Sequence, residues 1–202
     1  GVLPRVTKVD GGTLELVKSL GVKVVTSADL IQYATQRWSD IELDSHLKAS
    51  EILTTTVKEA FTYIGESIDS DLTEFEVAEF IRDRFSKRNL ITPDGPVVAI
   101  NDHSADPHFE PTETNSATIK PGDWVLIDLW GRIDNEPSVC ADITWTAFIG
   151  DKIPEQHVEV FNAVVGGRDA AVSLLEKAHK EGRQLQGWEV DAEARTYIEN
   201  TG

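Results

Sequence analysis

The chain has 202 residues, of which 40% are hydrophobic and 27% charged, as expected for a soluble globular protein of one domain or of one domain with part of another. Its 35 acidic residues outnumber its 19 basic residues and give a net charge of -16, which argues against nucleic-acid and membrane partners because phosphates and anionic lipids would be repelled. One cysteine cannot form an internal disulfide, and no apolar run approaches the roughly 20 residues of a membrane span, so we expect a cytoplasmic protein.

The first 40 residues predict the end of an α/β domain and a linker. Residues 12–20 carry apolar side chains at helical spacing, and Gly21 should end that helix. The β-branched residues 22–25 predict a short strand, and Ser27 is placed to cap a helix over residues 28–38. A single strand needs partner strands, so we expect this domain to begin upstream. A chain that starts with glycine, contains no methionine and stops at a helix-end signal also predicts a fragment of a longer protein.

Two amphipathic helices should follow. The first is predicted over residues 44–68, where apolar residues recur at three- and four-residue steps and so share one face. That face comprises Leu47, Leu53, Val57, Ala60, Phe61 and Ile64. Thr73 and Glu76 have the spacing of a capping box, which predicts the start of the second helix.

Paired strands and two more helices complete the predicted order. The strands are expected over residues 97–100, 124–133 and 139–149, with a polar loop at 101–121 and a turn at 134–137. The helices are expected from about Pro154 to His179 and from Trp188 to Asn200. Helices, then paired strands, then helices predict an α+β fold.

Two aspartates interrupt the long strands. Asp128 and Asp142 each stand in an otherwise apolar run, where a carboxylate must find donors or a cation. If the hairpin is centred on Asn135, the two residues lie opposite one another and project from the same face of the sheet. A divalent cation such as Mn, Co, Fe or Zn would relieve their repulsion. The alternative from spacing alone is that both aspartates only accept hydrogen bonds from nearby groups.

The sequence around these aspartates resembles the pita-bread metallopeptidases, which include methionine aminopeptidase, aminopeptidase P, prolidase and creatinase. The resemblance covers about residues 41–202 and is closest to the Xaa-Pro peptidases, in which a separate α/β domain precedes the catalytic one. Two segments resemble the family's metal-binding hairpin: Pro121-Gly122-Asp123-Trp124-Val125-Leu126-Ile127-Asp128, and residues 141–150, which begin Ala141-Asp142-Ile143-Thr144. Upstream, Asp106-Pro107-His108-Phe109-Glu110-Pro111 resembles its histidine-containing loop, and downstream residues 190–195 resemble the helix after the hairpin.

This resemblance implies the first part of a pita-bread catalytic domain with a site for two divalent metal ions, manganese above all. Asp128 would chelate one ion, and Asp142 would bridge both. A hydroxide between the metals would attack a peptide bond next to proline. His108 would hydrogen-bond the substrate or intermediate, with His103 as a rival in the same loop. Xaa-Pro peptidases of this type often pair through their N-terminal domains, so a homodimer is expected for the full-length protein.

The chain departs from the family pattern in three ways that bear on this site. The aspartates are fourteen positions apart instead of the usual eleven, which predicts a lengthened hairpin tip around residues 135–137. Trp145 replaces a basic residue, but strand alternation should turn it away from the metals. Cys140 shares the Asp142 face, where a small packed thiol is the expected role rather than a metal ligand.

The family completes its site with one histidine and two glutamates further along the chain than this sequence reaches. Glu189, Glu193 and Glu199 precede that region and are not candidates. We therefore predict that these 202 residues alone bind divalent metal weakly and have no peptidase activity. Two other functions stay open, namely a metal-free interaction module and a creatinase-like hydrolase of C–N bonds.

Overall fold

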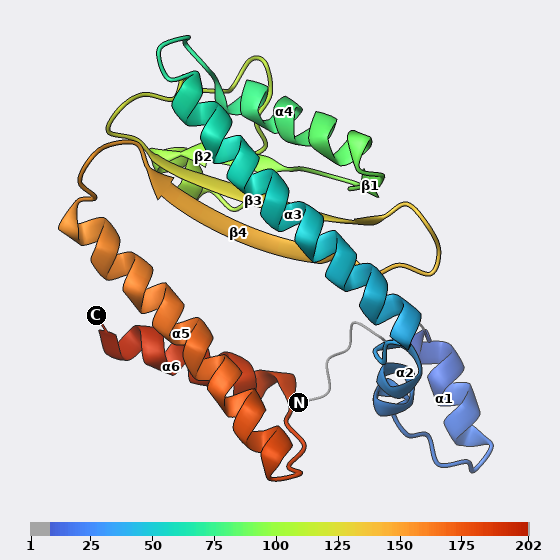
Figure 1. The fold of residues 1–202 in the computed structure, drawn as a ribbon. Helices are drawn as coiled ribbons and strands as arrows, with labels where there is room; N and C mark the ends of the chain where they lie inside the picture. Colours follow the sequence, from blue (N-terminus) through green and yellow to red (C-terminus); the bar gives the residue numbers. More distant parts are fainter. Residues whose placement is uncertain (1–8, 202) are drawn as a thin grey trace. The chain divides into compact units, whose positions relative to one another are not determined.

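The computed structural model describes residues 9–201, with residues 28 and 29 described by their backbone alone. The chain forms two compact units, which are described separately (Figure 1). The first unit extends to Lys120 and resumes over Trp124–Ala147, and it contains the sheet. The second comprises Pro121–Asp123 and the chain from Phe148 onward.

The N-terminal segment contains two short helices. α1, Gly11–Ser19, begins at Asp10, whose carboxylate accepts a hydrogen bond of 2.9 Å from the Thr13 backbone N–H. α2, Ala28–Thr35, has Ser27 at its N-cap position, although the Ser27 side chain makes no capping hydrogen bond. α1 lies where the apolar spacing predicts it, and α2 begins at the predicted residue but ends at Thr35, three residues before its predicted end. The prediction that residues 1–40 end a separate α/β domain stays a prediction, and its first eight residues lie outside the described part of the chain.

The predicted strand at residues 22–25 is wrong. These residues form an irregular connection between α1 and α2, and Val22, Val24 and Val25 are all exposed. A β-branched run favours a strand only where a neighbouring strand offers backbone hydrogen bonds and a surface to pack against. Within the described residues these three valines have no such neighbour.

The long helix α3, Asp40–Glu66, starts four residues before its predicted start. A capping box explains the earlier start, because the Ser39 N–H donates to the Glu42 carboxylate at 2.7 Å while the Ser39 hydroxyl accepts from the Glu42 N–H. Leu47 was predicted on the core face but is 57% exposed, so burial begins only further along the helix. The buried residues of α3 are Ala49, Leu53, Thr56, Val57, Ala60 and Ile64.

The next helix, α4, spans Glu74–Lys87 and confirms the predicted capping box. The Thr73 N–H donates to the Glu76 carboxylate at 2.8 Å, and the Thr73 hydroxyl accepts from the Glu76 N–H at 3.2 Å. α4 packs on α3 and on two strands of the sheet, burying Val77 and Ile81 completely. The cap therefore fixes the entry of the chain into a helix that forms part of the core.

The four-stranded sheet is built around β3 (Trp124–Ile133). Three strands pair with β3, namely β1 (Leu90–Ile91), β2 (Val97–Ile100) and β4 (Ala141–Phe148). β1 and β2 run antiparallel to β3, and Val97 lies opposite Asp128. Alternate β3 residues, Val125, Ile127 and Leu129, are fully buried, and α3 and α4 cover this face of the sheet (Figure 1). Side chains alternate along a strand, so Asp128 projects from the opposite face.

The hairpin between β3 and β4 has a loop of seven residues, 134–140, rather than the shorter turn predicted. β4 begins at Ala141 because the two preceding residues bind α3. The Val139 N–H donates to the Ser45 hydroxyl at 3.0 Å, and His46 Nδ1 donates to the Cys140 carbonyl at 2.8 Å. The Cys140 thiol is exposed, so the predicted packed thiol is wrong: residue 140 is held through its backbone.

The second unit consists mainly of two helices, α5, Glu155–Lys180, and α6, Gly187–Thr201, which pack on one another. Two glycines inside α5 allow this close approach. A Cβ at Gly166 would lie 2.2 Å from the Tyr197 ring, and one at Gly167 would lie 2.9 Å from Ile198. No helix in the described part of the chain is long and apolar enough to cross a membrane.

Candidate metal site

Asp128 and Asp142 lie on the face of the β3–β4 hairpin that α3 and α4 leave uncovered. The Thr144 hydroxyl donates a hydrogen bond of 2.6 Å to Asp128 Oδ1, so the Thr144 face of β4 is the face that meets Asp128. Asp142 is two residues from Thr144 in the same strand and therefore projects from that same face. By the same alternation Trp145 is expected to project from the other face, which stays a prediction.

The two carboxylates influence each other electrostatically. Burial raises the pKa of Asp142 above its ordinary value, and the negative charge of Asp128 raises it further. A carboxyl group whose ionised form is disfavoured in this way gains most from a cation placed between it and its neighbour. Asp128 and Asp142 therefore suit a shared divalent cation.

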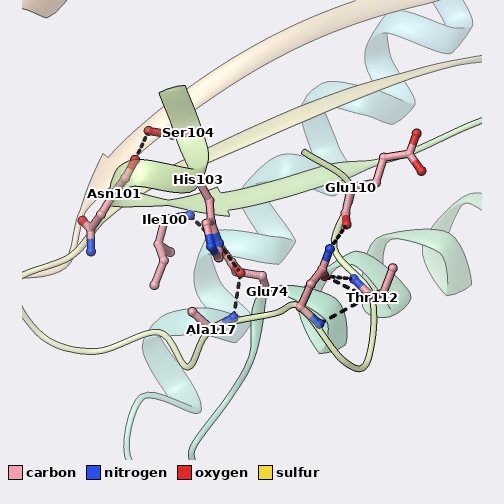
Figure 2. Close-up of polar contacts among 9 residues, drawn as sticks. Glu74, Ile100, Asn101, His103, Ser104, Glu110, Thr112 and Ala117 are labelled. Atoms are coloured by element: carbon pink, nitrogen blue, oxygen red, sulfur yellow. Dashed lines mark hydrogen bonds and ion pairs between the residues drawn. The ribbon is translucent and has the colours of Figure 1, made fainter. Parts of the chain in front are cut away.

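The two histidines of the loop after β2 have different surroundings. His108 has an exposed side chain, and its backbone N–H donates to Asp106 Oδ1 at 2.9 Å. The contacts described for His108 do not join its imidazole to either aspartate. His103 lies in the short 3₁₀ helix η2, Asn101–Ala105, with Nδ1 at 2.9 and 3.0 Å from the two carboxylate oxygens of Glu74 (Figure 2).

Glu74 is a buried acid that was not predicted from the sequence. Its side chain has no exposed surface, and it accepts hydrogen bonds from the Ile100 N–H at 2.7 Å and the Ala117 N–H at 2.8 Å. Both oxygens thus accept from backbone donors, so His103 completes the set as a donor through Nδ1. These partners lie 26 to 43 residues away in sequence, so no local pattern around Glu74 indicates them.

The profile of metallopeptidase family M24 matches residues 45–202, which is most of the chain and includes both aspartates and both loop histidines. The chain belongs to metallopeptidase family M24. A Mycoplasma genitalium protein assigned as an Xaa-Pro aminopeptidase is 26% identical over 162 residues, which is 80% of this chain and 43% of that protein. This M24 chain is thus similar in sequence to a protein about twice its length.

Solved structures give the same fold. The prolidase of Pyrococcus horikoshii matches with a TM-score of 0.68 and 25% identity, over 97% of this chain and 52% of the prolidase. The X-prolyl aminopeptidase of Caenorhabditis elegans matches with a TM-score of 0.63 and 21% identity, over 86% of this chain and 28% of that enzyme. That protein is described as a cytosolic enzyme with a di-nuclear active site. The predicted partial pita-bread fold of α+β class is confirmed, and the chain spans about half the length of the prolidase.

The donor set fits part of an M24 metal centre. Two carboxylates on one sheet face suit a hard or borderline divalent cation. The described residues contain no group of three or more His, Cys, Asp and Glu side chains that could hold a metal ion. Glu189, Glu193 and Glu199 all lie on α6. Within the described residues, Asp128 and Asp142 are therefore the two carboxylates that could contribute to such a centre.

The raised pKa of Asp142 predicts a pH-dependent effect of replacing it. The folded chain binds a proton at Asp142 more tightly than the unfolded chain, so the metal-free fold loses stability as pH rises from the ordinary value of 3.8 through the raised pKa. Asp142→Asn removes this loss, and we expect the metal-free variant to melt at a higher temperature than the wild type at neutral pH. Below pH 3.8 the two melting temperatures should converge.

Thermal melts across this pH range, with Asp151→Asn as a control at an exposed loop aspartate, test the prediction. Excess Mn²⁺ should reverse the order at neutral pH, because only the wild type gains stability from binding. A wild type that melts above Asp142→Asn without metal at neutral pH would contradict the prediction.

Proposed function

We propose that this chain forms part of a metal-dependent Xaa-Pro peptidase, of dipeptidase or aminopeptidase type. The observation that carries the proposal is the pair Asp128 and Asp142 on one face of the hairpin, in a chain that belongs to family M24. The Xaa-Pro assignment of the Mycoplasma relative and the fold of the Pyrococcus prolidase support the choice of substrate. Cytoplasmic location and a homodimer in the full-length protein stay predictions.

In this proposal Asp128 and Asp142 would be the residues of this chain that hold the divalent cations. The di-nuclear site named for the Caenorhabditis enzyme supports two ions, and Mn, Co, Zn or Fe would suit carboxylate ligands. Bound cations supply a water molecule of lowered pKa and stabilise negative charge on the substrate carbonyl. The chain's own contribution is orientation, because Thr144 fixes one oxygen of Asp128 through the 2.6 Å hydrogen bond.

His108 is the proposed catalytic histidine. Its imidazole is exposed and can reach a ligand, whereas Nδ1 of His103 is occupied by Glu74. In this role His108 hydrogen-bonds the substrate carbonyl or the intermediate that forms from it. This difference in surroundings supports His108 over His103.

The 202-residue chain on its own is expected to bind Mn²⁺ too weakly to retain it through gel filtration and to show no turnover of Xaa-Pro dipeptides. Two carboxylates cannot saturate two metal ions, and the described residues offer no further cluster of ligands. Calorimetric titration with Mn²⁺ and a dipeptide hydrolysis assay check this expectation. Appreciable turnover by the isolated chain would contradict it.

The activity itself is tested on the full-length gene product purified with Mn²⁺. Xaa-Pro dipeptides, longer peptides with proline in second position and creatine should be offered in parallel. Hydrolysis of the proline substrates supports the proposal, and the preferred length separates dipeptidase from aminopeptidase. Turnover of creatine alone would indicate the creatinase-like reaction, and metal-free protein without turnover would indicate an interaction module.

A further inference from the structure

The loop that carries His108 has both of its ends attached to one buried side chain. The Ile100 N–H, just before the loop, and the Ala117 N–H, at its far end, donate to the two oxygens of Glu74 (Figure 2). The Glu74 N–H in turn donates to the Ala117 carbonyl at 3.1 Å. A polar loop of this length would otherwise be mobile, since ordering each residue costs conformational entropy. Glu74 therefore fixes the two points between which the loop runs.

Glu74 also reaches the middle of the loop through His103. The His103 ring stacks on the Phe109 ring, with centroids 4.2 Å apart and planes 24° from parallel. Phe109 directly follows His108, and its backbone N–H donates to the Asp106 carbonyl at 3.1 Å. The backbone on both sides of His108 is thus held, while its imidazole is left exposed.

The part of the loop beyond His108 is closed by a second set of hydrogen bonds. Asn115 Oδ1 accepts from the Thr112 N–H at 2.7 Å, and Asn115 Nδ2 donates to the Glu110 carbonyl at 2.9 Å. These bonds shorten the free stretch of chain around His108. The link from Glu74 through His103 to Phe109 ties the centre of the loop to α4.

We propose that Glu74 and His103 are positioning residues for His108: Glu74 holds the loop ends and the His103 ring, and the His103 ring holds Phe109 and so the backbone of His108. The proposal rests on the proposed function in that it takes His108 as the catalytic histidine. A buried carboxylate is costly unless each partner is well placed. Here those partners set the position of one exposed imidazole.

The test uses two single variants of the full-length protein that break the link at different points. His103→Phe keeps a ring to stack on Phe109 but removes the donor to Glu74, and Phe109→Leu removes the stacking but keeps that donor. Histidine labelled with ¹³C at Cε1 gives one signal for His108, which is assigned by its loss in His108→Asn. Both variants should move or broaden the His108 signal by more than its linewidth, because both change half-buried side chains that contact its loop.

The control is Ile81→Val, a small core change on the same helix as Glu74, which should leave the His108 signal in place. In the active enzyme the two loop variants should lower kcat about tenfold or more at unchanged Mn²⁺ affinity, since misplacing a catalytic group affects the reacting step. An unmoved His108 signal in folded His103→Phe and Phe109→Leu would overturn the proposal. A wild type without Xaa-Pro turnover would refute the proposed function instead, and the spectra would still decide the positioning role.

Discussion

Replacing Glu74 with alanine is expected to lower the free energy of unfolding by about 3–5 kcal/mol. The substitution removes the acceptor for the N–H groups of Ile100 and Ala117 and for His103, and it leaves a cavity at a fully buried position. A loss of this size is a large fraction of the 5–15 kcal/mol that typically stabilises a domain. Urea unfolding followed by tryptophan fluorescence measures it.

Two further variants make this test specific. Glu76→Ala, in the same first turn of α4, removes an exposed carboxylate of the capping box and should cost only about 1 kcal/mol. Glu74→Gln keeps one acceptor oxygen but turns an amide NH₂ group toward a donor, so its cost should lie between the two. If Glu74→Ala unfolds at the same urea concentration as Glu76→Ala, Glu74 does not anchor the loop as the structure indicates.

If the full-length protein is the proposed Xaa-Pro peptidase, Asp128→Asn and Asp142→Asn are each expected to lower its kcat/KM by about 10³-fold or more. Losing one carboxylate ligand forfeits several kcal/mol of the charge stabilisation that bound metal provides, and each 1.36 kcal/mol corresponds to a factor of ten. Mn²⁺ content after dialysis, measured by atomic emission, should fall in parallel. Full activity with full metal content in either variant would refute the assignment of that aspartate.

Thr144 allows a graded version of the same experiment. Thr144→Val keeps the shape of the side chain but removes the hydroxyl that donates to Asp128, so metal affinity should fall about 10- to 100-fold. Thr144→Ser keeps the hydroxyl and should retain most of the affinity. Equal losses in both variants would show that the methyl group rather than the hydrogen bond matters.

Local signals in the sequence were enough to predict most helices and long strands. The capping box at Thr73 and Glu76 marks the start of α4, and the apolar runs place β2 and β3 at their observed positions. The strand predicted at residues 22–25 fails because strand formation depends on a partner that no local pattern reveals. β1 escaped prediction for the same reason, since two residues carry no periodicity and pair only through β3.

The same distinction between local sequence signals and distant partners applies to the residues of the site. Asp128 and Asp142 stand out as charges in apolar strands, and the alternation of β4 already groups Asp142 with Thr144. Glu74 could not be found in this way, because an acid in the first turn of a helix is ordinarily an exposed favourable charge. Only the fold shows that it is buried against partners from β2, η2 and the end of the following loop.

The attachment of residues 139 and 140 to Ser45 and His46 has a consequence for how such chains are recognised. Because β4 starts from this fixed point on α3, residues can be gained or lost at 134–137 without sliding one strand along the other. The number of residues between Asp128 and Asp142 can then change during evolution, whereas the distance between the two side chains is kept. A search pattern that demands a fixed interval between the two aspartates would therefore miss genuine members of the family, and one that allows the hairpin tip to vary would retain them.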